Sequence, residues 1–238
     1  MSYIEFNGAK SSDYHLYMEA GLTFNSPALD LELKKIPGSD GELAIGDGSL
    51  LNTKISFPFR LRIFDGSNVE TVSKNISNWL KKDALWHDLY FDGDPDYMYQ
   101  GIYYEEYNVE RIVSWYGKCV LNFTIKPYKF LKSGLIAVTS PTSLTNPTVR
   151  NAKPLITIKG TGNITLNIGT ETLTLKSVDG GVVIDCLKQT VTNLAGTAPA
   201  WDKVTSYPLP VIKPGKQAVL TTGTITELKI TPRYEVIV

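Results

Sequence analysis

A glycine-rich loop is the first segment of this chain whose residue types could bind a ligand. Residues 36–49, IPGSDGELAIGDGS, hold four glycines together with Asp40, Glu42 and Asp47. A phosphate-binding loop needs a lysine followed by serine or threonine, or a glycine pattern between a strand and a helix, whereas this loop continues into the strand-like LLNTKISFPFRLRIF. A calcium loop needs oxygen ligands at alternating positions and a closing glutamate, which these three acids do not supply. We therefore expect neither a nucleotide nor calcium here.

A second acidic group is the better candidate for a metal. Asp88, Asp92, Asp94 and Asp96 place four carboxylates within nine residues. Carboxylate oxygens suit hard cations, but a strand followed by a turn at Pro95 explains the same residues without a metal. The sequence predicts no metal site, and it leaves open a cation near Asp92 to Asp96.

Catalytic pairs are also missing from the sequence pattern. Glu105 and Glu106 are adjacent, and on an expected strand they would point to opposite faces, so they do not form a glycosidase pair. His15 and His87 are the only histidines, and no GxSxG motif accompanies them. We expect no catalytic residue, no cofactor and no enzyme activity.

The two cysteines carry no metal or redox motif. Cys119 and Cys186 have no CxxC spacing or histidine partner, which favours free thiols in a reducing compartment. The amino terminus lacks a basic region followed by an apolar run, and no segment approaches the ~18 apolar residues that span a bilayer. We expect a soluble chain without membrane insertion.

Composition divides the chain into two parts. Residues 1–133 hold 22 of the 25 aromatic residues, whereas residues 134–238 hold three aromatics and 19 threonines. Lys and Arg number 14 against 18 Asp and Glu in the first part, and 10 against 6 in the second, so neither part has the strongly basic balance of a nucleic-acid binder. We predict two domains, residues 1–133 and 134–238.

One amphipathic helix is expected in the first domain. The segment SNVETVSKNISNWLKK, residues 67–82, begins with Ser67 three positions before Glu70, which is the spacing of a capping box. Its apolar residues recur on one helical face, which more often covers a sheet than binds a partner. They are Val69, Val72, Ile76, Trp79 and Leu80.

The remainder is typical of short strands between turns. In the first domain, residues 92–95 form an expected turn, and alternating apolar residues at 119, 121, 123 and 125 mark one face of a strand. Residues 132–154 have no clean period and are the expected junction. In the second domain, turns are expected at residues 160–163 and 179–181, between antiparallel strands. The predicted fold is mainly β, with two β-sandwich domains, one flanking α-helix and an extended loop or hairpin.

Five segments in this order resemble the distal tail protein family of long, non-contractile-tailed bacteriophages. They are IEFNGAKSSDYHLYM, IPGSDGELAIGDG, a helix ending in NWL, YFDGDPDYMYQGIYY and GKCVLNFTIKPYKF. The second half is similar to the carboxy-terminal domain of the same family through PLITIKGTGNITLNIG, VVIDC and YPLPVIKPGKQAVL. No single motif decides the resemblance, which depends on their order and spacing.

The resemblance implies a structural role in the virion. A tail-tube-like first domain would form a hexameric ring of this chain between the tail-tube protein and the tail-associated tip protein. A galectin-like or carbohydrate-binding-module-like second domain would project outward and dock receptor-binding or baseplate proteins. DNA would pass through the lumen as cargo, and the mildly acidic first domain suits such a channel because like charges repel. The expected location is the tail tip or baseplate of a virion assembled in the bacterial cytoplasm.

Two further expectations concern contacts. The loop residues Ser39, Asp40, Gly41, Glu42, Leu43, Ala44, Ile45, Gly46, Asp47 and Gly48 are the predicted contact with an adjacent subunit or tail component, against the alternative of a solvated loop. The rival function is a second domain that recognises host cell-wall saccharide. It would need exposed aromatic residues, whereas Trp201, Tyr207 and Tyr234 are few and could belong to the core.

Overall fold

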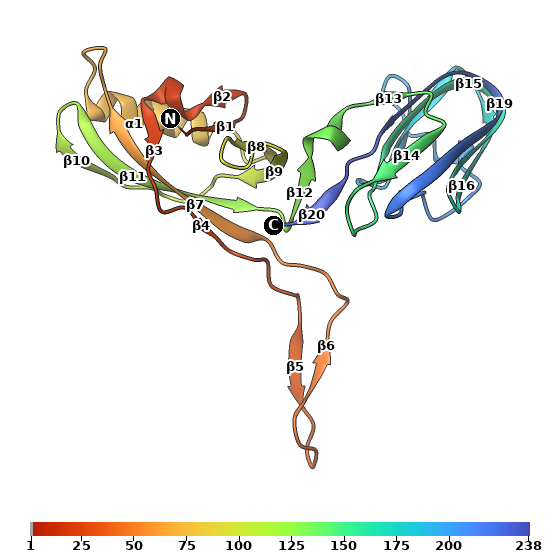
Figure 1. The fold of residues 1–238 in the computed structure, drawn as a ribbon, viewed down its shortest axis with the longest axis horizontal. Coiled ribbons are helices and arrows are strands. Elements are labelled where there is room, and N and C mark those ends of the chain that lie inside the picture. The colour runs from red at the N-terminus through yellow and green to blue at the C-terminus, as the bar shows by residue number, and fades with distance from the viewer. Residues whose placement is uncertain (1) are drawn as a thin grey trace. The chain divides into compact units, whose positions relative to one another are not determined.

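The computed structural model describes residues 2–238, which form two compact units (Figure 1). The first unit runs to Lys129 and also contains Ile237 and Val238, and the second is Phe130–Val236. The mainly β fold predicted from the sequence is confirmed, and α1 is the single α-helix within residues 2–238. The domain limits of 1–133 and 134–238 stay a prediction.

The first unit is built on an antiparallel sheet in the order β2-β1-β8-β9-β11-β7-β3, with β10 beside β11 and β4 beside β7. A short 3-10 helix, η1 (Ser11–Tyr14), follows β2. The strands are β1 (Ile4–Phe6), β2 (Ala9–Lys10), β3 (Leu16–Met18), β4 (Thr23–Phe24), β7 (Thr53–Arg62), β8 (His87–Phe91), β9 (Tyr97–Ile102), β10 (Val109–Val113) and β11 (Tyr116–Ile125). β5 (Glu32–Lys35) and β6 (Glu42–Ile45) form a separate two-stranded sheet.

The centre of the first unit is the pair β7 and β11. Ten consecutive residue pairs join them, and every second side chain of each strand is buried. This alternation of buried and solvated residues is that of an antiparallel sheet with one covered face. Phe123 packs edge-to-face against Phe6 and Phe57, with ring centroids 5.0 and 5.8 Å apart. The predicted buried face at residues 119–125 of β11 is confirmed.

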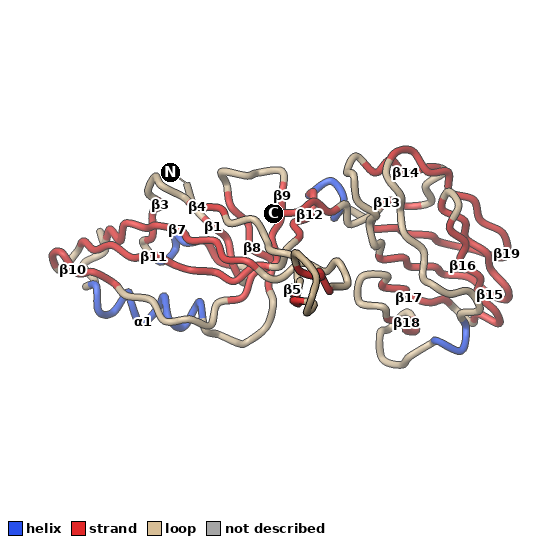
Figure 2. Tube along the Cα trace, turned by 90° about the horizontal axis from the view of Figure 1, so that it is seen from below, coloured by secondary structure: helices blue, strands red, loops and turns tan. Residues whose placement is uncertain are grey.

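Helix α1 (Val69–Leu80) covers this core (Figure 2). All five residues of its predicted apolar face are buried. The predicted cap is wrong, because Asn68 and not Ser67 is the N-cap, and its Oδ1 accepts a hydrogen bond from the Thr71 amide at 2.9 Å. A shift of one residue places the asparagine oxygen over the free amides of the first turn. Glu70 pairs with Arg111 instead of closing a capping box.

The second unit is a curled antiparallel sheet in the order β13-β19-β15-β17-β18, with β14 beside β19 and β16 beside β15. Its strands are β13 (Val138–Thr139), β14 (Ser143–Asn146), β15 (Leu155–Ile168), β16 (Glu171–Val178), β17 (Gly181–Asp185), β18 (Thr190–Asn193) and β19 (Gly215–Thr231). The short helices are η2 (Lys132–Leu135) and η3 (Trp201–Lys203). β12 (Tyr128–Leu131) and β20 (Glu235–Ile237) contain the two points at which the chain passes between the units.

The turn predicted at residues 160–163 is wrong, because β15 runs through it without a break. The first half of β15 pairs with β17 and the second half with β16, while β19 follows both halves. The pairing register shifts near Gly160, where an added Cβ would lie 2.3 Å from the carbonyl oxygen of Thr224. Glycine therefore permits a close backbone approach at a bend, and the turn expected near Asp179 is present between β16 and β17.

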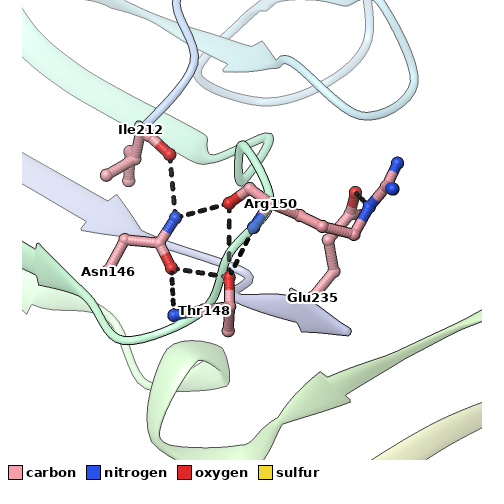
Figure 3. Close-up of polar contacts among 5 residues, drawn as sticks. All are labelled: Asn146, Thr148, Arg150, Ile212 and Glu235. Carbon is pink, nitrogen blue, oxygen red and sulfur yellow. Dashed lines mark hydrogen bonds and ion pairs between the residues drawn. The ribbon is translucent and has the colours of Figure 1, made fainter. Parts of the chain in front are cut away.

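A buried asparagine fixes the segment that follows β14 (Figure 3). The Asn146 side-chain amide donates to the carbonyl oxygens of Arg150 and Ile212, at 2.7 and 2.9 Å. Its Oδ1 accepts from the backbone amide and the hydroxyl of Thr148, at 3.0 and 2.8 Å. Residues 147–150 belong to no strand, and the Asn146 side chain supplies hydrogen bonds to their backbone that a strand ladder would otherwise provide.

Candidate interaction arm

A β-hairpin stands apart from the sheet of the first unit (Figure 1). Its strands β5 and β6 pair antiparallel from Glu32 with Ile45 to Lys35 with Glu42. The pairing resumes at Leu29 and Leu50, where backbone hydrogen bonds close the base. We call residues 28–51 the arm. Every residue from 28 to 49 is exposed, so no other part of residues 2–238 covers it.

The tip of the arm follows from local turn chemistry. The Ser39 amide donates to the Ile36 carbonyl oxygen at 3.2 Å, which closes a four-residue turn around Pro37 and Gly38. Proline presets the backbone at the second position, and Gly38 has a φ of 82° at the third, as a type II turn requires. The first part of the glycine-rich loop, residues 36–41, is therefore the turn of a hairpin, and residues 42–45 are its second strand.

An irregular step lies between β6 and the base of the arm. Three residues, 46–48, lie opposite Leu31 alone, because the next contact after the pair of Glu32 with Ile45 is the hydrogen bond from the Asp30 amide to the Ser49 carbonyl oxygen. Asp47 stabilises this step, because its Oδ1 accepts a hydrogen bond from the Ser49 amide at 2.8 Å. Hydrogen bonds from the hydroxyl and amide of Ser49 lower the pKa of Asp47. The acids of the loop thus shape and solvate the hairpin.

Both faces of the arm carry exposed apolar side chains. Leu43 and Ile45 lie on one face with Glu32 and Lys34, because these residues are direct cross-strand partners. Leu33 and Ala44 lie on the other face. Seven large apolar residues of the arm are 45 to 57% exposed, and they are Leu29, Leu31, Leu33, Ile36, Leu43, Ile45 and Leu51. An isolated two-stranded hairpin is marginal in water, so such an arm is suited to a partner that covers it.

The predicted contact residues fall in three parts of the arm. Residues 39–41 belong to the tip, residues 42–45 are β6, and residues 46–48 form the irregular step. The sequence prediction left out β5 and the leucines before it, although the alternation in ALDLELKK is typical of a strand. Contact with a partner stays a prediction for these residues.

Two of the four acids near the β8–β9 turn, Asp94 and Asp88, bind other protein groups. Asp94 accepts hydrogen bonds from the Tyr99 hydroxyl at 2.6 Å and from Lys129 at 2.5 Å, and Asp88 accepts one from Gln100. The turn predicted at residues 92–95 is present between β8 and β9. Within residues 2–238, no group of three or more His, Cys, Asp or Glu side chains is placed to hold a metal ion.

The glutamates and histidines considered for catalysis occupy separate surroundings. Glu105 and Glu106 lie in the loop between β9 and β10, so the strand expected for them is wrong. Glu105 pairs with Lys54. His15 lies 3.2 Å from Asp65, and His87 lies 2.6 Å from Asp83.

Both cysteines are free and buried. Burial raises the pKa of each thiol to about 12, so both are uncharged near neutral pH. No helix within residues 2–238 is long and apolar enough to cross a membrane.

The second unit exposes two of the three aromatic residues singled out from its sequence. Tyr207 is 76% exposed and Trp201 is 41% exposed, whereas Tyr234 belongs to the core. The two exposed rings lie on the segment between β18 and β19. They keep the saccharide alternative open for experiment.

Comparison with known proteins was made by family, by sequence and by structure. No protein-family model matches this chain, and no curated protein matches it. Among solved structures, the chain is similar to the Dit protein of phage SPP1, described as a paradigm of the hub adsorption apparatus in phages that infect Gram-positive bacteria. The TM-score is 0.74 at 15% identity, and the match covers 100% of both chains. This chain has the fold of a phage hub protein.

Two structures of the phage p2 baseplate in its activated conformation show a weaker likeness. The one with strontium matches at a TM-score of 0.53 and 10% identity, over 100% of this chain and 99% of that chain. The one with calcium matches at 0.51 and 11% identity, over 97% of each chain. At these identities the shared property is the fold.

Proposed function

We propose that this chain is a structural protein of a phage virion, a subunit of the hub at the distal end of the tail. The observation that carries the proposal is the likeness to SPP1 Dit over the whole of both chains. A fold alone does not fix function, but here the match includes both units and needs no catalytic site. The protein would act through its shape and its contacts.

The hub is a ring of six copies in this proposal. Residues 1–133 form the ring, and residues 134–238 lie at its periphery and dock receptor-binding or baseplate proteins. The exposed arm supports the proposal, because an arm that packs on a different surface of the adjacent copy makes a contact between unlike surfaces. A contact between unlike surfaces of identical copies closes into a ring when the rotation from each copy to the next is a whole fraction of a full turn.

Within the virion, the ring joins the tail-tube protein to the tail-associated tip protein. DNA passes through its lumen, and the net charge of −4 in residues 1–133 suits a channel that does not retain DNA. This part of the proposal requires acidic side chains on the lumen wall. A basic lumen in a structure of the assembled ring would contradict it.

Electron microscopy of the purified chain, alone and mixed with the tail-associated tip protein of the same phage, tests the proposed function. We expect six-fold annular particles in at least the mixed sample, because the tip protein can nucleate the ring. Separate, non-annular particles in both samples would contradict the proposal. A deletion variant tests the role of the arm. It lacks residues 36–48, which a two-residue Asn-Gly turn replaces, and we expect it to fold but not to assemble.

A second function is favoured by the exposed rings of the second unit. In this function, the exposed rings of Trp201 and Tyr207 stack on the apolar face of a sugar, and the protein recognises host cell-wall saccharide directly. A glycan array with the full chain tests this function. Saturable binding that is lost in a Trp201→Ala, Tyr207→Ala variant would support it, and no binding by the native chain would remove it.

A further inference from the structure

A pocket of about 470 Å³ lies in the first unit, away from the arm. It opens between the β1–β2 turn, helix η1 and helix α1, and its volume falls in the range of small-ligand sites. Its wall combines aromatic rings with amide, carboxylate and ammonium groups. The lining residues that matter to the argument are Asp13, Tyr14, Asn75, Asn78, Trp79 and Lys82.

The aromatic part of the pocket is fixed in place. Tyr14 stacks on Trp79 with the ring planes 10° apart and the centroids separated by 4.6 Å. The Trp79 Nε1 donates a hydrogen bond to the carbonyl oxygen of Phe6 at 2.8 Å, which holds the indole against the core. Trp79 is buried, so a ligand meets the half-buried Tyr14 ring, and because this ring is already held in place the entropic cost of binding is reduced.

The amides of the pocket are free to bind. Across residues 2–238, the side chains of Asn75 and Asn78 make no hydrogen bond, and both are exposed on α1. Asparagine is a poor helix former, and at exposed helix positions alanine, glutamate or lysine would stabilise α1 better. The local structure therefore gives no reason for two asparagines on this face. The lining residue Asn7 differs, because its φ of 50° in the β1–β2 turn explains its identity.

The charges of the pocket cancel. Asp13 accepts a hydrogen bond from the Lys10 amide through Oδ2 at 3.0 Å, which leaves Oδ1 open. Lys82 supplies a positive charge on the same wall. A pocket with one carboxylate, one ammonium group and two free amides favours a ligand that is neutral and has many hydroxyl groups.

We propose that this pocket binds a neutral saccharide. A primary amide offers both a donor and an acceptor, so each asparagine can pair with neighbouring hydroxyl groups of a sugar ring. Asp13 Oδ1 accepts from a further hydroxyl group, and Lys82 donates to a ring or hydroxyl oxygen. The apolar face of the sugar packs on the half-buried ring of Tyr14, which Trp79 supports from behind. This site is independent of the proposed hub function and of the aromatic residues of the second unit.

The test is a titration of the full-length chain with a panel of neutral and acidic oligosaccharides. Saturation-transfer NMR detects the bound sugar, and tryptophan fluorescence follows the affinity. We expect saturable binding of at least one neutral oligosaccharide. Each of Asn75→Ala and Asn78→Ala is expected to weaken it about 5-fold, and the double variant about 25-fold, because each removes one or two hydrogen bonds.

These variants keep the proposal testable because alanine stabilises a helix, so loss of binding would not come from unfolding. Lys74→Ala, an exposed substitution on the same helix outside the pocket, is the matched control and is expected to bind as the native chain does. The proposal is overturned if no neutral saccharide binds, or if binding persists in the double variant. It is also overturned if binding is lost only in the Trp201→Ala, Tyr207→Ala variant.

Discussion

Replacing Leu43 and Ile45 of the arm by serine should impair assembly without weakening the fold. The two side chains are 50 and 46% exposed and lie on one face of the hairpin. Surface substitutions of this kind change the free energy of unfolding by less than about 0.5 kcal/mol. The isolated chain should therefore keep its melting temperature.

The effect on assembly follows from the apolar area that a partner would cover. Full burial of a leucine or isoleucine side chain contributes about 1.5–3 kcal/mol, and about half of each side chain is still exposed. Covering both residues would therefore contribute about 2 kcal/mol to each contact, which corresponds to an association constant changed by roughly 30-fold.

The assay is sedimentation velocity with electron microscopy over a range of concentrations, using the chain with its tip protein. The variant should need roughly 30-fold more protein to form rings. Leu220→Ser, on β19 of the second unit and 63% exposed, is the matched control and should assemble as the native chain does. The reasoning is refuted if the variant assembles at the native concentration, or if it loses stability in proportion to assembly.

Three other substitutions test the fold. Asn68→Ala should lower the free energy of unfolding by about 1 kcal/mol in a urea titration, because it removes the cap of α1, and Ser67→Ala should have almost no effect; equal losses would contradict the assigned cap. Asn146→Ala should cost roughly 2–4 kcal/mol, because it removes the amide donor to the Arg150 and Ile212 carbonyl oxygens and leaves the buried Thr148 amide without an acceptor; a loss below 1 kcal/mol would contradict the buried network. Asp185→Asn should cost about 3 kcal/mol at pH 7, because it leaves the Arg233 guanidinium unpaired. Burial opposes ionisation of Asp185, but hydrogen bonds from Arg233 and the Lys188 amide outweigh it and hold the pKa of Asp185 below its ordinary value. The stability that depends on this carboxylate is therefore present above about pH 4, and it is lost as the pH falls through the folded-state pKa. The difference between native chain and variant should shrink in denaturation at pH 3, and a difference that stayed constant would contradict the pairing.

Much of the architecture could be predicted from local sequence patterns. The buried face of α1 follows from apolar residues spaced at the helical period, and that of β11 from strict alternation of apolar and polar residues. The turn between β8 and β9 follows from glycine and proline, whose backbone preferences act over a few residues. Such patterns depend on neighbours in the chain, which the sequence contains in full.

Patterns failed where a distant strand decided the outcome. The glycines at 160 and 162 are typical of a turn, but β19 runs beside both halves of β15 and supplies hydrogen-bond partners across the bend. Glu105 and Glu106 follow a strand-like run, yet β9 ends at Ile102, before the loop that holds them. Asn146 gave no periodic signal, because its partners at Arg150 and Ile212 are brought together only by folding.

The sequence by itself determined that the chain is mainly β, that it has one amphipathic helix, and that its glycine-rich loop lacks the ligands for phosphate or calcium. Only the tertiary structure decided that this loop forms the turn and the second strand of an exposed hairpin. The alternation of leucines with charged residues in β5 is also what a core strand would show, because alternation specifies which side chains share a face and not what covers that face. Burial depends on the rest of the chain, and for residues 28–49 nothing within residues 2–238 provides it.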